Sequence, residues 1–239
     1  MRGRNRMPEA AFVEMFDSMG AEAYDQFNAH FQTTKDNLQF ISKLILQDIP
    51  DDSKILCVGV GTGEDILTLA KTYPSWSFVG IDPSSVMLEG CRTKLNNAGI
   101  SERVELFQGF LSDYKGNTKF NAVLCHFVMH FIKNFEERRQ MYLDMNGMLV
   151  NDGHLLISEL SCDLQSPLFD RQLGMWKALH AFAGASEEKL ENLGHSFKEQ
   201  LGIIAPMETE KLIESTGFLY PVQFMQSMFV RSWHSQKND

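Results

Sequence analysis

The sequence feature that most constrains the fold is a glycine-rich stretch, Gly59-Val60-Gly61-Thr62-Gly63. The apolar run at residues 55–60 predicts a buried β-strand, and residues 64–72 carry a helical pattern. Glycine lets the backbone turn tightly and approach a ligand closely. The helix that follows offers free N–H groups and the positive end of its dipole. The stretch therefore predicts a strand, a ligand-binding loop and a helix, in that order.

The same alternation continues down the chain. Further strands are predicted at 77–81, 104–107, 122–126 and 155–158, and further helices at 84–97 and 134–150. The strand segments are almost continuously apolar, as in strands that are buried on both faces. This alternation predicts an α/β fold with a parallel sheet and helices on both faces. The turn Asn151-Asp152-Gly153 is expected to end a helix just before a strand.

The two ends of the chain depart from this rhythm. Residues 1–50 read as helical up to the break at Pro50, and 51–239 as the α/β domain. Residues 161–206 have helical pattern without strand signal and predict an inserted helical cap. A helix at 207–215, stopped by Gly217, then precedes two closely linked apolar runs at 218–225 and 227–233. So short a link requires an antiparallel hairpin.

An acidic residue supports ligand binding at the glycine loop. Asp82 ends the second predicted strand, 19 residues after Gly63, in the stretch Gly80-Ile81-Asp82-Pro83-Ser84. An acid at this position accepts hydrogen bonds from the two hydroxyls of a ribose. The order strand, loop, helix, strand, acid predicts a nucleoside-type ligand. The alternative is that the glycines only turn the chain and Asp82 only caps a helix.

Composition limits the partners and the compartment. Lys and Arg total 22 and Asp and Glu total 31 in 239 residues, a net charge of −9. This charge argues against general binding to nucleic acid or anionic lipid. The longest apolar run, residues 122–132, is too short to span a bilayer, and we expect no signal peptide at residues 1–7. The 4 cysteines form no CxxC pair, which predicts no metal site and a reducing, cytoplasmic setting.

These motifs together resemble the class I S-adenosylmethionine-dependent methyltransferases. The pattern is GxGxG, with Glu64 where dinucleotide enzymes have Gly or Ala. The likeness runs through the first strand and loop, the Asp82 segment, Gln108-Gly109-Phe110-Leu111, the stretch 122–132 and the terminal hairpin. It implies a Rossmann-like seven-stranded sheet, mostly parallel with an antiparallel last strand, helices on both faces and a helical cap. A nicotinamide oxidoreductase is a weaker alternative.

The resemblance also implies a set of ligand-binding residues. The cofactor would be S-adenosyl-L-methionine, released as S-adenosyl-L-homocysteine, with the helices of 1–50 covering its site. The residues expected to bind it are Tyr24, Gly59, Val60, Gly61, Gly63, Asp82, Pro83, Ser84, Met87, Gly109, Phe110, Leu111, His126 and Phe127. Trp176 and His180 of the cap are candidates for a small-molecule substrate, and core packing is their alternative role.

The sequence departs from the resemblance at three places. Cys57 and Phe110 stand where the family commonly has acids. Within the family, the chain also resembles the carboxy-S-adenosylmethionine synthase group of tRNA wobble-uridine modification, which uses a cap arginine to hold an extra carboxylate. No arginine lies between Arg171 and Arg231. The equivalent region of the cap has His195, and a neutral histidine would bind a carboxylate more weakly than a bidentate guanidinium does. Ordinary S-adenosylmethionine is therefore the expected cofactor.

The expected chemistry is methyl transfer by in-line displacement to a small-molecule acceptor. His126 and His130 follow the fourth strand, at the edge where ligands bind in such sheets. His130 is a candidate general base, because imidazole titrates near neutral pH, and a hydrogen-bonded wall of the pocket is its alternative role. Two rival functions stay open: a carboxy-S-adenosylmethionine synthase-like enzyme and a non-catalytic adenosyl-binding protein. A homodimer through the N-terminal helices or the cap is left open too.

Overall fold

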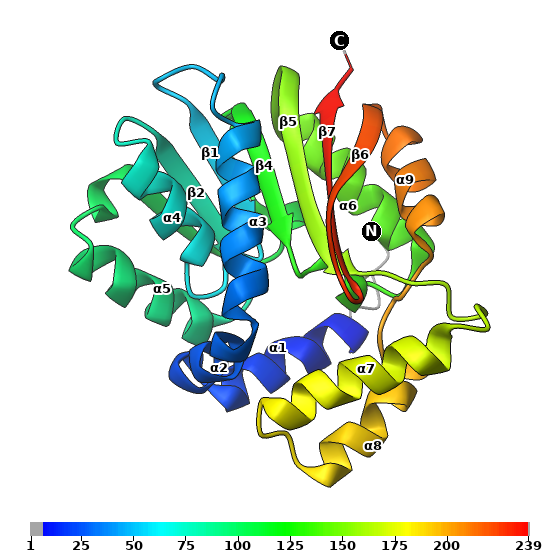
Figure 1. The fold of residues 1–239 in the computed structure, drawn as a ribbon. Helices are drawn as coiled ribbons and strands as arrows, with labels where there is room; N and C mark the ends of the chain where they lie inside the picture. Colours follow the sequence, from blue (N-terminus) through cyan, green and yellow to red (C-terminus); the bar gives the residue numbers. More distant parts are fainter. Residues whose placement is uncertain (1–6, 239) are drawn as a thin grey trace.

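The computed structural model describes residues 7–238, whose centre is a seven-stranded sheet in the order β3-β2-β1-β4-β5-β7-β6 (Figure 1). The strands are β1 (Lys54–Val58), β2 (Ser77–Asp82), β3 (Val104–Gln108), β4 (Phe120–His126), β5 (Leu149–Leu160), β6 (Phe218–Ser227) and β7 (Val230–Lys237). Strands β1 to β5 pair in parallel, whereas β7 runs antiparallel to both β5 and β6. The predicted α/β class, the parallel sheet and the antiparallel last strand are confirmed.

Helices cover the sheet and its lower edge. The elements are α1 (Met7–Met19), α2 (Ala21–Asn28), η1 (Ala29–Phe31), α3 (Gln32–Ile45), α4 (Glu64–Thr72), α5 (Ser85–Asn97), η2 (Ser101–Arg103), η3 (Leu111–Asp113), η4 (Met129–Phe131), α6 (Phe135–Met148), α7 (Phe169–Phe182), α8 (Glu187–His195), η5 (Ser196–Gln200) and α9 (Pro206–Glu214). Helices α3, α4 and α5 lie on one face of the sheet and α6 and α9 on the other (Figure 1). None of the described helices is long and apolar enough to cross a membrane.

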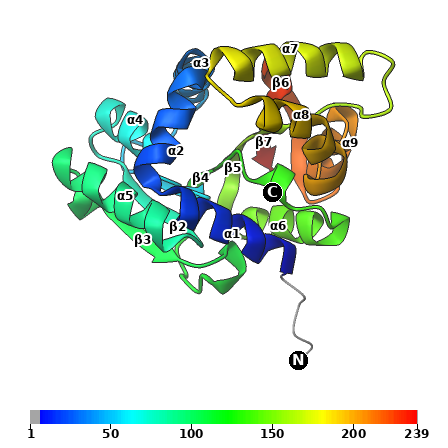
Figure 2. The same cartoon turned by 90° about the horizontal axis from the view of Figure 1, so that it is seen from below.

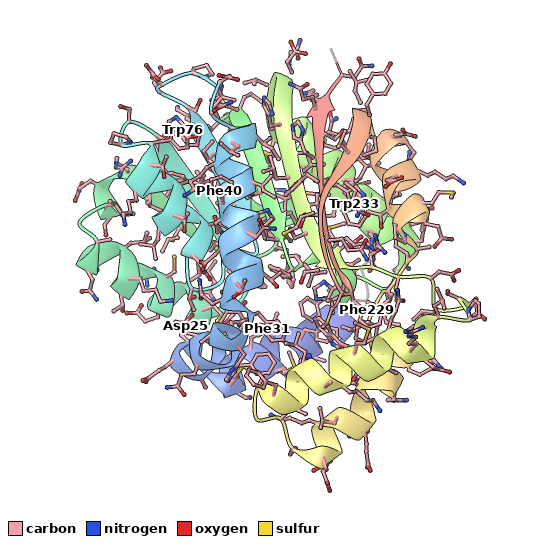
Figure 3. All side chains as sticks on the ribbon, viewed as in Figure 1. Asp25, Phe31, Phe40, Trp76, Phe229 and Trp233 are labelled. Carbon is pink, nitrogen blue, oxygen red and sulfur yellow. The ribbon has the colours of Figure 1, made fainter. Side chains whose placement is uncertain are left out.

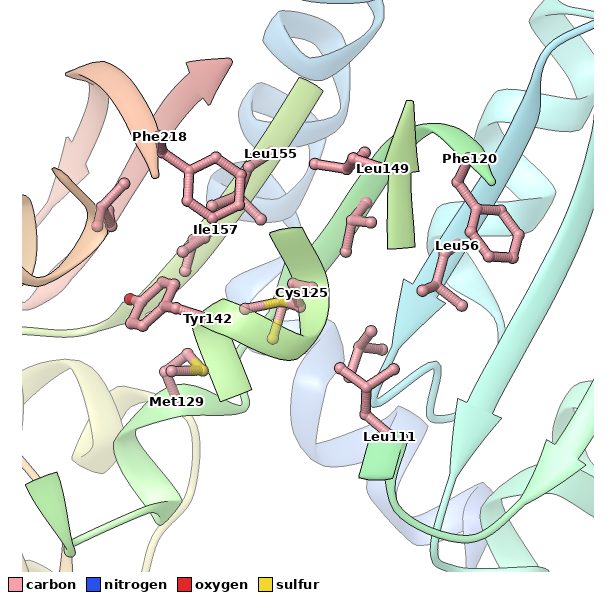
Figure 4. Close-up of a cluster of buried hydrophobic side chains, with 14 of the residues drawn as sticks. Leu56, Leu111, Phe120, Cys125, Met129, Tyr142, Leu149, Leu155, Ile157 and Phe218 are labelled. Carbon is pink, nitrogen blue, oxygen red and sulfur yellow. The ribbon is translucent and has the colours of Figure 1, made fainter. Parts of the chain in front are cut away.

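Alternation along the strands builds two cores. On β1, Leu56 packs with α6 and α9, whereas Ile55 and Cys57 pack with α4 and α5 on the opposite face. This is the period-two geometry of a strand between two helical layers. Figure 4 shows the first core, in which Ile157 of β5 lies near Tyr142 of α6, and Phe120 of β4 belongs to the same cluster on the side of Leu56. The two cores hold the sheet rigid, so its carboxyl edge is a fixed platform.

That carboxyl edge is covered by helices of the N-terminal segment and by helices of the segment between β5 and α9. Helices α1 and α2 cross beneath it on the side of α5, and α7 and α8 lie beneath the β6–β7 hairpin (Figures 1 and 2). Phe31 of η1 and Phe229 of the hairpin both pack on Trp176 of α7, at ring centroid distances of 5.7 Å (Figure 3). The helical pattern at 161–206 therefore forms a helical layer that packs on the N-terminal segment.

One local expectation was wrong. Residues Asn151-Asp152-Gly153 do not separate a helix from a strand, because β5 already begins at Leu149 and runs through them with a shift of register against β4. Asp152 takes a positive φ of 57° at this irregularity. His126 ends β4, whereas His130 lies in the three-residue η4. The two imidazoles therefore do not share a helix face.

Candidate functional site

A cavity of about 430 Å³ opens at the carboxyl edge of the sheet. It lies beside the first helices of the chain, the glycine loop and α6. Its lining residues are Phe12, Val13, Phe16, Tyr24, Val58, Gly59, Gly61, Ile81, Asp82, Pro83, Met87, Gly109, Phe110, Leu111, Ser112, His126, Phe127, Val128, Phe131, Ile132, Glu136, Glu137, Gln140, Met141 and Asp144. This volume is within the range of small-molecule and cofactor sites.

Two glycines of the loop have neighbouring atoms so close that a side chain at either position would clash with them. Gly59 and Gly63 have positive φ angles of 68° and 88°. A Cβ atom on Gly59 would lie 2.2 Å from a methyl group of Val128, and one on Gly63 would lie 2.6 Å from the sulfur of Cys91. Both positions therefore require glycine for space as well as for backbone conformation. Gly61, with a φ of 54°, lies beside the cavity, and a Cβ there would lie 4.0 Å from the hydroxyl of Tyr24.

The N–H groups of the loop bind within the protein. The amides of Gly59 and Val60 both donate to the carbonyl of Ile81, and the amide of Gly63 donates to Val60. The amide of Gly61 donates to Oδ2 of Asp82 at 2.8 Å. These bonds tie the loop to the end of β2. They also mean that these four amides are already bonded within the protein.

Asp82 is the polar centre of this edge. Its Oδ1 accepts a hydrogen bond from the amide of Ser84 at 2.9 Å, and its Oδ2 holds Gly61. Burial raises the pKa of Asp82 to about 6, the two backbone hydrogen bonds oppose that rise, and Asp17 adds to it. Each carboxylate oxygen accepts more than one hydrogen bond. Asp82 can therefore brace the loop and still accept hydroxyl groups of a ligand in the cavity.

The structure brings most of the predicted cofactor residues together. Those in the cavity lining are Tyr24, Gly59, Gly61, Asp82, Pro83, Met87, Gly109, Phe110, Leu111, His126 and Phe127. Val60, Gly63 and Ser84 are outside it. Val60 is buried beneath β2, Gly63 begins α4, and the hydroxyl of Ser84 caps α5 by accepting from the amide of Met87. These three residues shape the edge from behind the lining.

His126 is held in the cavity wall by a carboxylate that the sequence did not single out. Its Nδ1 lies 3.1 Å from both carboxylate oxygens of Asp65 in α4. The side-chain amide of Gln39 in α3 also donates a hydrogen bond to Asp65. Burial alone would raise the pKa of Asp65, but His126, Gln39 and Lys35 hold it below its usual value. Among the described residues, Nε2 of His126 is one of the few buried polar atoms without a hydrogen-bond partner.

The structure does not bring His130 into the cavity lining. Its side chain is buried, and its Nδ1 accepts a long hydrogen bond of 3.4 Å from the amide of Leu160. Burial lowers its pKa to about 3, and the neighbouring Arg138 adds to this effect. A neutral imidazole behind the wall fits a structural role better than that of a general base. The sequence signal at 126–130 therefore points to the other histidine of the pair.

Trp176 and His180 also lie away from this cavity. Both are buried in an aromatic cluster that joins α7 to the N-terminal segment, with ring centroids 5.0 Å apart. His180 packs on Phe31 at 5.4 Å and on Phe27 at 6.0 Å. Their helical spacing is explained by this packing. The substrate role that we expected for them has no support from their position.

Two groups of lining residues were missed. Phe12 and Phe16 of α1 pack on Phe131 of η4, at centroid distances of 4.6 Å and 5.6 Å, and form an apolar wall. Their spacing of four residues in a helical pattern is a signal that could have found them, because it places both rings on one helix face. The second group lies along one face of α6 and consists of Glu136, Glu137, Gln140, Met141 and Asp144. Nothing in the sequence pattern distinguishes these residues from an ordinary solvated face.

The cavity is negatively charged. Four carboxylates line it, those of Asp82, Glu136, Glu137 and Asp144, and none of its described lining residues is Lys or Arg. Burial, followed by nearby Asp82, raises the pKa of Tyr24 to about 12, so its phenol stays protonated. A low-dielectric cleft lined by one sign of charge attracts ligands of the opposite sign. The described residues contain no group of three or more residues suited to hold a metal ion.

Polar contacts fasten the N-terminal helices over this edge. Asp17 of α1 accepts a hydrogen bond of 2.5 Å from the hydroxyl of Ser84. Asp25 of α2 accepts one of 2.7 Å from Thr62 in the glycine loop and forms an ion pair with Lys94 of α5. Exposed ion pairs add little stability. These contacts therefore set the position of α1 and α2 and leave most of their stability to the aromatic wall.

Comparison with known proteins identifies the central domain. Residues 55–153 match the sequence model of a family described as a methyltransferase domain. Carboxy-S-adenosyl-L-methionine synthase from Nautilia profundicola is 22% identical over 204 residues, which are 85% of this chain and 86% of that protein. Demethylmenaquinone methyltransferase from Bacteroides fragilis is 27% identical over 157 residues, which are 65% of this chain and 62% of that protein.

The fold is shared with solved structures. One is described as an O-methyltransferase from Nostoc punctiforme, with a TM-score of 0.67 and 14% identity. The match covers 91% of this chain and 58% of that one, so this chain spans little more than half of the solved protein. At this identity, the likeness supports the fold. The matched segment 55–153 includes the glycine loop, Asp82 and His126, which all lie at the cavity.

Proposed function

Because the chain belongs, through this domain, to the class I S-adenosylmethionine-dependent methyltransferases, we propose that it transfers the cofactor's methyl group to a small-molecule acceptor by in-line displacement. The observation that carries this proposal is the cavity at the carboxyl edge, where the glycine loop, Asp82 and the Gly109 segment meet. Ligands of open α/β sheets bind at this edge. The four buried free cysteines support a reducing, cytoplasmic setting.

In this proposal the nucleoside lies between the ends of β2 and β3. Asp82 accepts the ribose hydroxyls, while Pro83, Met87 and the Gly109-Phe110-Leu111 segment surround the adenine. Asp113 does not take the place of the acid that Phe110 replaces, because its Oδ2 accepts from the amide of Phe110 and it is outside the lining. Recognition of the base therefore rests on shape and on polar groups such as Ser112 and the α6 face.

For methyl transfer, the protein must align the acceptor with the methyl group and exclude water from the site. The bound cofactor supplies a methyl group that its sulfonium has already activated. Tyr24 and Phe127 place aromatic surface in the cavity, where a cation is attracted to a ring face. Phe12, Phe16 and Phe131 exclude water on the side of α1. We propose that helices α1 and α2 cover the cofactor and that a partly apolar acceptor enters beside them.

The charge of the cavity lining favours methyl transfer over the function of the carboxy-S-adenosylmethionine synthases, one of which is 22% identical to this chain. A carboxylated cofactor brings a second carboxylate into the cavity, where none of the described lining residues is Lys or Arg. A buried carboxylate without a cation is strongly disfavoured. S-adenosylmethionine itself carries one more positive charge and suits the four carboxylates of the wall.

The test is a comparison of the two cofactor forms on the purified chain. We expect S-adenosylmethionine to bind at least about tenfold more tightly than carboxy-S-adenosylmethionine, because a single unfavourable charge contact is worth 1.4 kcal/mol or more, about tenfold. Isothermal titration with each compound measures the ratio. Equal or tighter binding of the carboxylated form would contradict the assignment and favour the synthase. Radioactive methyl transfer to a panel of small apolar acceptors then searches for the substrate.

A further inference from the structure

The function described so far does not use the two carboxylates in the first turn of α6. Glu136 and Glu137 both belong to the cavity lining. The third α6 carboxylate of the lining, that of Asp144, already accepts a hydrogen bond of 2.8 Å from Gln140. No described residue forms an ion pair with either Glu136 or Glu137. The described part of the chain therefore leaves two negative charges at the cavity unbalanced.

Acids in the first turn of a helix also stabilise the helix, because they lie at the positive end of its dipole. Asn134 caps α6 by accepting from the amides of both glutamates. Helix α8 has a similar start, with Glu187 and Glu188 after the N-cap Ser186, yet these two acids do not line the cavity. The helix dipole thus explains acids at both helices. A ligand role for the α6 pair needs separate observations, and two are present.

The first observation is a buried imidazole nitrogen in the same cavity lining. Nδ1 of His126 lies 3.1 Å from both carboxylate oxygens of Asp65, which hold a ring proton on that nitrogen. In the neutral ring, Nε2 then presents a lone pair. His126 is only 7% exposed, and its Nε2 has no hydrogen-bond partner among the described residues. A buried acceptor of this kind calls for a ligand that donates a hydrogen bond.

The second observation is a row of four aromatic rings along the cavity, formed by Tyr24, Phe16, Phe131 and Phe12. Their successive ring centroids are 5.9 Å, 5.6 Å and 4.6 Å apart. Phe131 ends η4, which comes shortly before the start of α6 in the chain. Aromatic rings cover apolar groups and attract cations to their faces. This aromatic row therefore suits a ligand that is apolar along its stem and positive at one end.

Charge and hydrogen bonding agree on the class of ligand. The four lining carboxylates and the lone pair of His126 are acceptors, and none of the described lining residues is Lys or Arg. An anionic ligand would be repelled by this wall. A neutral ligand would leave the α6 carboxylates without a counter-charge as the cavity loses water, which is costly. An ammonium group supplies both a positive charge and hydrogen-bond donors.

Resting on the proposed function, we propose that the methyl acceptor is a small molecule with an ammonium group on an apolar stem, and that Glu136 and Glu137 bind the ammonium group. In the proposed function, Asp82 and the Gly109 segment hold the nucleoside of the cofactor. The part of the cavity lined by α1, η4 and the start of α6 is then left for the acceptor. The aromatic row covers the stem of the acceptor and excludes water from the charged contact.

The experiment compares two probes of the same shape on the protein saturated with S-adenosylhomocysteine, which fills the cofactor's part of the cavity. Phenethylamine carries an ammonium group at neutral pH, and phenethyl alcohol has a neutral hydroxyl group in its place. We expect the amine to bind at least about tenfold more tightly than the alcohol in isothermal titration, because only the amine pairs with the carboxylates. Phenylacetate, an anion of similar size, should bind more weakly than either.

A pair of double variants assigns the preference to α6. Glu136→Gln/Glu137→Gln should reduce the advantage of the amine to about threefold or less and leave the affinity for the alcohol unchanged. Glu187→Gln/Glu188→Gln is the matched control, because it removes two acids from the first turn of α8, away from the cavity. The control should keep the full preference. Circular dichroism verifies that both variants are folded.

The possible failures are distinguishable. If S-adenosylhomocysteine does not bind the unaltered protein, the proposed function fails and this inference fails with it. If it binds, but the amine has no advantage over the alcohol or does not bind at millimolar concentration, the acceptor class is wrong and the cofactor assignment stands. A preference for the amine that survives Glu136→Gln/Glu137→Gln would also overturn the inference, since another group would then bind the ammonium.

Discussion

Single residues at the glycine loop combine two roles, the shape of the loop and access to the cavity. Gly63 begins α4 against Cys91 of α5, whereas Gly61 faces the cavity with only the Tyr24 hydroxyl near it. Both have positive φ angles, so both disfavour any other residue to a similar degree. Of these two glycines, however, only Gly63 has a neighbouring atom close enough to clash with an added Cβ atom. The two positions therefore separate backbone strain from packing.

We predict that Gly63→Ala lowers the free energy of unfolding by about 2–3 kcal/mol and Gly61→Ala by about 1 kcal/mol. The added methyl at residue 63 would lie 2.6 Å from the Cys91 sulfur, and the one at residue 61 would lie 4.0 Å from the nearest atom. Urea unfolding followed by circular dichroism measures both. Cys91→Ala in the Gly63→Ala background should restore part of the loss. Equal losses at the two glycines, without such rescue, would count against the steric account.

Much of the residue-level site was predictable, and the exceptions have physical causes. Glycines and Asp82 were found because the loop chemistry is local in sequence. His126 was expected in the cavity, but its anchor Asp65 lies 61 residues away on another element, and no local pattern reports such a pair. His130 was one candidate for a base because histidines titrate near neutral pH, with a place in the pocket wall as its alternative role. Its burial beside Arg138, which removes that property, depends on how the cap returns to the sheet.

At the scale of elements, one buried ion pair joins four segments. Arg138 of α6 and Glu159 of β5 are both almost fully buried and form an ion pair. Arg138 also donates to the carbonyl of Gly202, at the end of the cap, and Thr209 of α9 donates to Glu159 at 2.8 Å. Burial raises the pKa of Glu159, and Arg138 opposes that rise. The network fixes where the cap segment rejoins the α/β domain.

We predict that Arg138→Met lowers the free energy of unfolding at neutral pH by about 3–5 kcal/mol, because Glu159 is left charged and unpaired in the core. The double variant Arg138→Met/Glu159→Gln should be more stable than the single one, since the neutral amide still accepts from Thr209. Without its arginine, Glu159 has a folded pKa above its unfolded value. The deficit of the single variant should therefore shrink as the pH falls toward about 4. A double variant that is less stable than the single one would contradict this.

The elements themselves were largely predictable from apolar periodicity. Strands between two helical layers give unbroken apolar runs, and amphipathic helices give a repeat of three to four residues. The errors lie where tertiary contacts override local preference. Asn151-Asp152-Gly153 is typical of a turn, yet β5 pairs with β4 on both sides of it, at Leu149 and again from His154, so the stretch is an irregularity within one strand. The aromatic residues of α7 were read as substrate candidates because their packing partner, η1, is remote in sequence.

For the whole molecule, the arrangement of layers places one acidic cavity beneath the sheet. The parallel strands deliver the glycine loop, Asp82 and His126 to a common edge, and α1 and α2 close over it (Figure 2). Four of the chain's carboxylates thus line the cavity that we propose as the ligand site. A ligand that carries a positive sulfonium suits this field. The α6 carboxylates could not be assigned to the cavity from the sequence, because the helix predicted at 134–150 carries them in a pattern that also fits an ordinary solvated face.

The most direct test of the central claim is a calorimetric titration of the ligand-free protein with S-adenosylhomocysteine. We predict one-to-one binding with a Kd near 1 μM, about −8 kcal/mol. Asp82→Ala should abolish it, because the ribose loses its acceptor and the glycine loop loses its brace. Asp52→Ala, at an exposed aspartate before β1 and so at the opposite end of that strand from the glycine loop, should bind as the unaltered protein does. No binding to the folded, unaltered protein, or equal binding by Asp82→Ala, would contradict the assignment of the cavity as the cofactor site.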